Sequence, residues 1–126
     1  MFKDDFYSIT EHSFIEPNIA EFTVRFNLEH IIYHVHFKNN PITPGVLIVQ
    51  IVKELFSFLK KDDFSIKKVK SIRFVHPLIP TEHSEAQYKL ELQTVDNEGL
   101  YPVNVTVYSR DIVFSKIKLY LKQGNL

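Results

Sequence analysis

The stretch HVHFKNNPITPGVLIVQIVKELFSFLKK, residues 34–61, decides the fold of this chain. Its second half, which follows Pro44-Gly45, contains no further glycine or proline and predicts a helix over about residues 44–60. Apolar residues fill the run except at positions with helical spacing, which are Gln50, Lys53, Glu54, Ser57, Lys60 and Lys61. We therefore expect a helix that is buried around most of its circumference.

Five other stretches alternate apolar and polar residues with period two, which predicts half-buried strands. They cover about residues 22–28, 72–74, 88–93, 103–107 and 117–121. Short polar breaks around Gly99 and Arg110 predict that the last three strands form an antiparallel meander. A curved antiparallel sheet wrapped around one long central helix satisfies both patterns with one core. This is an α+β fold, and we expect it to be a single domain over residues 1–126.

Composition narrows the classes of function. Hydrophobic residues make up 44% and charged residues 24% of the chain, which is typical of a globular protein. Eleven Phe and six Tyr without Trp indicate large apolar side chains in a core or in the walls of an acyl tunnel. Basic and acidic residues are equal in number, at 15 each, which does not favour nucleic-acid binding. The chain has no cysteine, so disulfides, thiolate nucleophiles and cysteine metal sites are excluded.

The N-terminal and surface features predict location and partners. Residues 1–14 carry acidic side chains and no long apolar run, so we expect neither a signal peptide nor a membrane helix, and a cytoplasmic location. An open sheet edge is normally covered or paired, so we expect a homodimer with a continuous sheet, or a higher oligomer. A solvated strand face or a docking surface for an acidic carrier protein would each explain the basic cluster Lys67, Lys68, Lys70 and Arg73.

The same stretch carries the candidate chemistry. His36 lies in a turn-rich loop that leads to the N-terminus of the predicted helix, where free N–H groups and the helix dipole favour negative charge. Gly45 allows another group to approach the backbone closely. A base that faces such an N–H group is what abstraction of a proton next to a thioester carbonyl requires.

These residues resemble the signature His-Phe-Pro-Gly-x-Pro-x-x-Pro-Gly-Val-Leu of the β-hydroxyacyl-carrier-protein dehydratases of the FabA/FabZ type. The matching positions are His36, Phe37, Pro41, Pro44, Gly45, Val46 and Leu47. Residues 73–80, RFVHPLIP, resemble the second landmark of the family, Phe-x-x-Pro-x-x-Pro. The resemblance covers about residues 20–122 and implies the hot-dog fold.

The resemblance implies a role for each matching residue. His36 would be the general base, and the Gly45 N–H would polarise the thioester carbonyl. The side chains that would line the substrate site are Phe37, Pro44, Val46, Phe74 and His76. The substrate would be an acyl-carrier-protein or coenzyme A thioester, with no cofactor and no metal. A zinc site at His34 and His36 is the alternative, but the sequence offers no clear third ligand.

The chain departs from the family at the position of the catalytic acid, which is Gln50. Gln50 could simply be the first of the polar residues with helical spacing, which form the polar stripe of the helix, and have no chemical role. It could instead orient the 3-hydroxyl group or a water molecule while His36 transfers the protons. Glu54, one turn later, could instead supply the acid. Residues 50–54, QIVKE, resemble the Gln-Ile-x-Lys-Glu segment of hot-dog proteins in bacterial secondary-lipid and pigment pathways, which indicates a Gln-containing branch.

Three functions remain open from the sequence. A dehydratase would convert a 3-hydroxyacyl thioester to the 2-enoyl thioester in fatty-acid, secondary-lipid or pigment biosynthesis. A non-catalytic acyl-binding or scaffold subunit of a hot-dog heterocomplex would explain why the acid is missing. An acyl thioesterase is the third, since an amide or carboxylate on the helix can also position water.

Overall fold

The computed structural model of the chain describes residues 2–35 and 39–124. This part of the chain contains two helices, α1 (Ile31–Val35) and α2 (Gly45–Lys60). Its strands are β1 (Tyr7–Glu16), β2 (Ile19–Phe26), β3 (Phe64–Phe74), β4 (Glu85–Leu92), β5 (Tyr101–Ser109) and β6 (Ile112–Gln123). The six strands form one antiparallel sheet in the order β1-β2-β4-β5-β6-β3.

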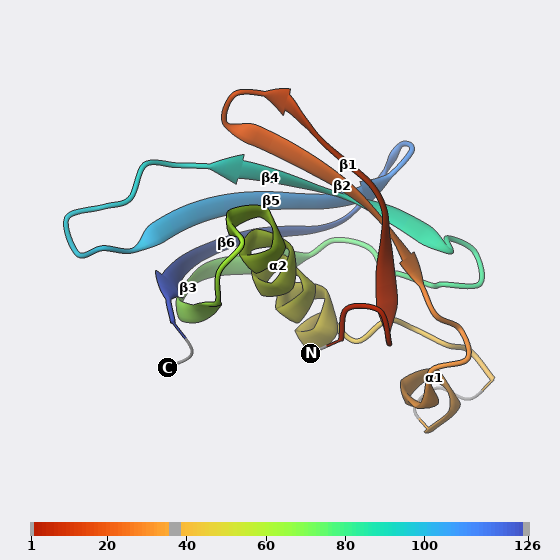
Figure 1. The fold of residues 1–126 in the computed structure, drawn as a ribbon. Helices are drawn as coiled ribbons and strands as arrows, with labels where there is room; N and C mark the ends of the chain where they lie inside the picture. Colours follow the sequence, from red (N-terminus) through yellow and green to blue (C-terminus); the bar gives the residue numbers. More distant parts are fainter. Residues whose placement is uncertain (1, 36–38, 125–126) are drawn as a thin grey trace.

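Helix α2 crosses one face of the curved sheet (Figure 1), which confirms the predicted sheet around one long helix. Ile51, Val52 and Leu55 are completely buried, because apolar positions occupy most of the helix circumference. The hydroxyl group of Tyr88 on β4 donates a hydrogen bond of 3.0 Å to the Ile48 carbonyl and ties the helix to the sheet. No helix among the described residues is both long and apolar enough to span a membrane.

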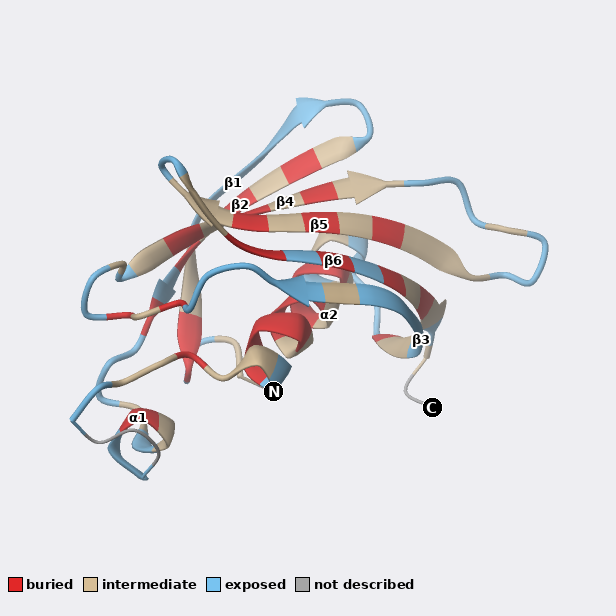
Figure 2. Cartoon of the chain, turned by 180° about the vertical axis from the view of Figure 1, so that it is seen from behind, coloured by how far each residue is buried: buried red, intermediate tan, exposed pale blue. Residues whose placement is uncertain are grey.

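The inner face of the sheet follows the predicted period of two. Phe22 of β2 is paired with Tyr88 of β4, which is paired with Val107 of β5, and all three are fully buried. Strands β4, β5 and β6 are consecutive neighbours in the sheet, so the predicted meander is confirmed. Figure 2 shows the resulting rows of buried residues along these strands.

The two edge strands differ from the prediction. Strand β1 was not predicted, and strand β3 begins at Phe64 rather than near residue 72. Both strands are exposed along most of their length (Figure 2). An edge strand with little buried surface does not need alternating apolar residues, so the period-two signal is absent or short there.

Candidate functional site

The N-terminus of α2 is the structural centre of the predicted site. Pro44 is the N-cap, with φ −60° and ψ 137°, and no side chain caps the helix by a hydrogen bond. The first N–H groups of a helix have no intrahelical acceptor, so this end favours a partner with negative charge. A Cβ atom on Gly45 would lie 2.5 Å from Cζ of Phe74. The structure therefore brings Gly45 and Phe74 together, and the close approach expected at Gly45 is made by the Phe74 ring.

Two further predicted site residues, Val46 and His76, are exposed. Val46 points to solvent, with 76% of its surface exposed. His76, expected to line the substrate site, follows the end of β3, is exposed, and donates from Nδ1 to the Pro77 carbonyl at 2.9 Å. His36 and Phe37 lie outside the described residues, so their roles stay predictions.

The zinc alternative named His34 and His36 as ligands. His34 belongs to helix α1, so the chain is helical up to Val35. Within residues 2–35 and 39–124, no group of three or more His, Asp or Glu side chains is arranged to hold a metal ion.

A buried hydrogen bond joins the two ends of the loop between α1 and α2. The hydroxyl groups of Tyr33 and Thr43 are 2.8 Å apart, and both residues are almost fully buried. The Thr43 N–H donates to the Leu78 carbonyl at 2.8 Å. Burial raises the pKa of Tyr33 to about 12, so its hydroxyl stays protonated at neutral pH. Both ends of the loop are thus fixed to the core, an arrangement that the sequence analysis missed.

Replacing Tyr33 by phenylalanine is expected to loosen this loop. The change leaves the buried Thr43 hydroxyl without its partner, which should lower the free energy of unfolding by about 1–3 kcal/mol. Urea unfolding measures this loss. Thr10→Val is a matched control, because the Thr10 hydroxyl makes an exposed hydrogen bond at 3.2 Å to the Thr23 carbonyl. If both variants lose the same free energy of unfolding, the buried hydrogen bond between Tyr33 and Thr43 does not stabilise the loop as we infer.

Glu54 was expected on the polar stripe of the helix or as a substitute acid, but the structure buries it to 1% exposure. Four groups donate hydrogen bonds to its carboxylate. They are the N–H of Phe2 (3.1 Å to each oxygen), the N–H of Lys3 (2.8 Å), the hydroxyl of Tyr7 (3.1 Å) and Nε2 of Gln50 (3.4 Å). Burial and the charge of Glu54 raise the pKa of Tyr7 far above its usual range, so this hydroxyl remains a donor.

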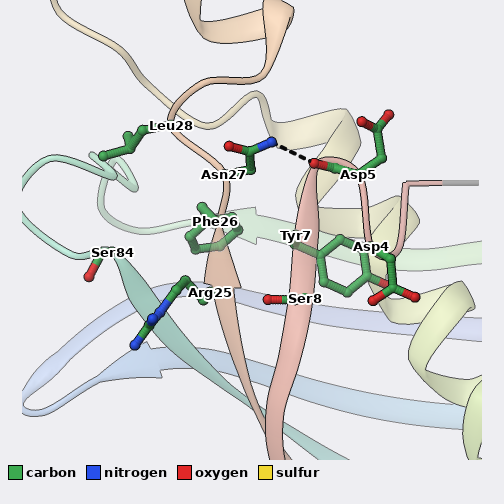
Figure 3. A pocket seen from close by; sticks show the side chains of 9 residues that line it. All are labelled: Asp4, Asp5, Tyr7, Ser8, Arg25, Phe26, Asn27, Leu28 and Ser84. Carbon is green, nitrogen blue, oxygen red and sulfur yellow. Dashed lines mark hydrogen bonds between the residues drawn. The ribbon is translucent and has the colours of Figure 1, made fainter.

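A separate hollow of about 510 Å³ lies beside the start of β1 and the end of β2 (Figure 3). Tyr7, Arg25, Phe26 and Ser84 are among the residues that line it, and Asn27 donates a hydrogen bond of 2.9 Å to the Asp5 carbonyl at its rim. None of the described site residues predicted from the sequence lines this hollow. We therefore centre the candidate site on the N-terminus of α2.

Comparison with family models decides the family. The model of the ApeI-like family, described as ApeI dehydratase, matches residues 11–109. The chain belongs to the ApeI-like dehydratase family. The match includes Gly45, Gln50 and Phe74, and it supports the dehydratase resemblance at the level of this family. Closer kinship to the FabA/FabZ type stays a prediction.

Solved structures confirm the hot-dog fold of this ApeI-like chain. The dehydratase heterocomplex ApeI:P from Xenorhabdus doucetiae superposes with a TM-score of 0.68 at 18% identity, covering 90% of this chain and 96% of the other. An uncharacterized protein from Erwinia carotovora subsp. atroseptica gives 0.69 at 15% identity, with coverages of 91% and 94%. A variant of a hypothetical thioesterase from Streptococcus pneumoniae gives 0.59 at 13% identity, with coverages of 98% and 95%. A search of curated proteins found no match.

Proposed function

We propose that this ApeI-like protein removes water from 3-hydroxyacyl thioesters. The observation that carries the proposal is the N-terminus of α2 at Gly45, where no side chain caps the helix, together with the hydrogen bond between Tyr33 and Thr43 on either side of His36 in the sequence. Membership of a dehydratase family supports the same reaction.

The reaction needs one base and one oxyanion site. A ligand carbonyl would displace the Phe74 ring from Gly45 and accept a hydrogen bond from the Gly45 N–H, which lowers the cost of removing the C2 proton. His36 would take that proton, and the C2 electron pair would form the double bond to C3 while the C3–O bond breaks. The same imidazolium would return the proton to the departing hydroxyl, so that water leaves. Gln50, from the partner subunit as the family resemblance implies, would hold this hydroxyl in place.

The exposed edge of β3 supports a homodimer. Val69 on this strand is 49% exposed and Phe74 is 55% exposed, although both are apolar. Pairing two β3 edges across a two-fold axis would satisfy the open backbone groups and cover Val69. This assembly would also allow Gln50 of one subunit to serve the site of the other.

Replacing Val69 by aspartate is expected to weaken this dimer at least tenfold. A charged side chain on an edge strand opposes pairing with another chain, and aspartate would lose its water where Val69 is covered. Analytical ultracentrifugation measures the dissociation constant. Ile15→Asp, on the opposite edge strand β1 and 51% exposed, is the matched control. The β3 dimer is excluded if Val69→Asp leaves the dissociation constant at its wild-type value.

A second candidate is a non-catalytic subunit that binds an acyl group beside an active relative. Two observations favour it: Gln50 replaces the family acid, and one similar solved structure is a dehydratase heterocomplex. Purification from the native cell followed by mass analysis of the intact complex would reveal a stoichiometric hot-dog partner if this reading holds.

The deciding experiment incubates the purified protein with 3-hydroxyacyl-carrier-protein and 3-hydroxyacyl-coenzyme A of several chain lengths, followed by intact mass measurement. Loss of one water from the acyl group establishes the dehydratase and identifies the preferred carrier and chain length. Release of the free acid would instead establish a thioesterase. An unchanged acyl group on every substrate would overturn the dehydratase proposal.

A further inference from the structure

The hydrogen bonds of Glu54 determine which way the Gln50 amide faces. A carboxylate only accepts hydrogen bonds, so the NH₂ group of Gln50 must be the part that meets Oε2 of Glu54, at 3.4 Å. The Gln50 carbonyl oxygen is then directed away from Glu54. Gln50 is half-buried, so this oxygen has access to a ligand on the open side of the helix.

Glu54 is itself held in one orientation. Its Oε1 accepts from the N–H groups of Phe2 and Lys3 and from the Tyr7 hydroxyl, at 3.1, 2.8 and 3.1 Å. These donors come from the N-terminal segment and β1, which are distant from the helix in sequence. The carboxylate is buried and its oxygens already accept hydrogen bonds from these groups, so Glu54 is poorly placed to contact a ligand.

We propose that Glu54 is a positioning residue that makes Gln50 a hydrogen-bond acceptor for the 3-hydroxyl group of the substrate. This inference rests on the proposed dehydratase function and assigns its hydroxyl recognition. When the hydroxyl group donates its hydrogen to Gln50, the lone pairs of its oxygen remain free to receive the proton from His36. An amide in the opposite orientation would donate an N–H to that oxygen and compete with protonation.

The substitution Glu54→Gln tests the orientation. Phe2, Lys3 and Tyr7 still require an oxygen, so the new amide must place its own NH₂ group toward Gln50. Gln50 must then turn its oxygen inward and its NH₂ group outward. The variant therefore inverts the group that meets the ligand and keeps nearly the same volume in the core.

Calorimetry measures the effect through the binding of two thioesters that cannot be dehydrated. A 2,2-dimethyl-3-hydroxyacyl pantetheine thioester has no C2 proton and cannot be dehydrated, and the 2,2-dimethylacyl thioester lacks the hydroxyl group. Wild-type protein should prefer the hydroxylated ligand by about tenfold, the value of one net hydrogen bond. Glu54→Gln should remove most of this preference, whereas Tyr88→Phe, which deletes another buried hydroxyl contact of α2, should retain it.

A double-mutant cycle separates positioning from a general structural effect. In the Gln50→Ala background, Glu54→Gln should no longer change the ratio of the two dissociation constants. A preference that survives Glu54→Gln, or an effect of Glu54→Gln that persists without Gln50, would overturn the inference. Because neither ligand can be dehydrated, these outcomes are distinct from failure of the dehydratase assay.

Discussion

Replacing His36 by alanine is expected to reduce dehydration of a 3-hydroxyacyl thioester by roughly 10²–10⁴-fold, the usual contribution of a general base. The loss should be near the upper end of this range, because the family acid is replaced by Gln50 and His36 would both remove and return the proton. Single-turnover measurement by intact mass gives the rate of the chemical step.

The neighbouring substitution His34→Ala is the control for this experiment. His34 is an exposed residue of α1 and has no part in the proposed mechanism. Thermal unfolding should show that both variants are folded. Unchanged turnover in His36→Ala would show that His36 is not the base. The proposed roles of Gly45 and Gln50 would then require another group to remove the proton.

The largest effect on stability is expected for Phe56→Ala. Phe56 is 1% exposed and forms a closed cluster of rings with Phe64 and Tyr101, with centroids 4.8 and 5.9 Å from its own. The cluster fixes the last turns of α2 to β3 and β5. Truncation of a buried Phe costs about 3–5 kcal/mol, a large share of the 5–15 kcal/mol that stabilises a typical domain. Urea unfolding should show a midpoint far below that of the wild type.

Phe58→Ala is the matched control for this cluster. Phe58 belongs to the same helix, but it is 39% exposed and contacts His12 and Phe22 at the edge of the core. Its truncation should cost clearly less than that of Phe56. If the two variants unfold at the same urea concentration, the ring cluster does not stabilise the end of the helix as we infer.

The main architecture could be predicted because burial determines periodicity. The run after Gly45 keeps apolar residues on most sides, and only a helix surrounded by a sheet buries such a surface. The alternating residues of β2, β4, β5 and β6 face that helix, so their period of two is strong. Strand β1 has mostly exposed residues, and no comparable constraint acts on its sequence.

The contacts around the candidate site could not be predicted, since they join residues with no periodic relationship. Tyr33 and Thr43 meet across the His36 loop, and Glu54 meets Phe2 and Lys3 more than fifty residues away in the sequence. Spacing placed Glu54 on the polar stripe, but tertiary hydrogen bonds decide its burial. The role of Gln50 likewise depends on its hydrogen bond to Glu54, so several roles for Gln50 stayed open from the sequence alone.

The ring of Phe74 over Gly45 has a kinetic consequence. Gly45 is required for space, because its Cβ would overlap the ring, and a ligand that approaches Gly45 from the side of the ring would displace it. Phe74 is 55% exposed, so its rotamers should exchange within picoseconds to nanoseconds. Enzymatic turnover takes about a millisecond to a second. We therefore expect entry past Phe74 to be in rapid equilibrium, so that this side chain influences the apparent affinity and not the maximal rate.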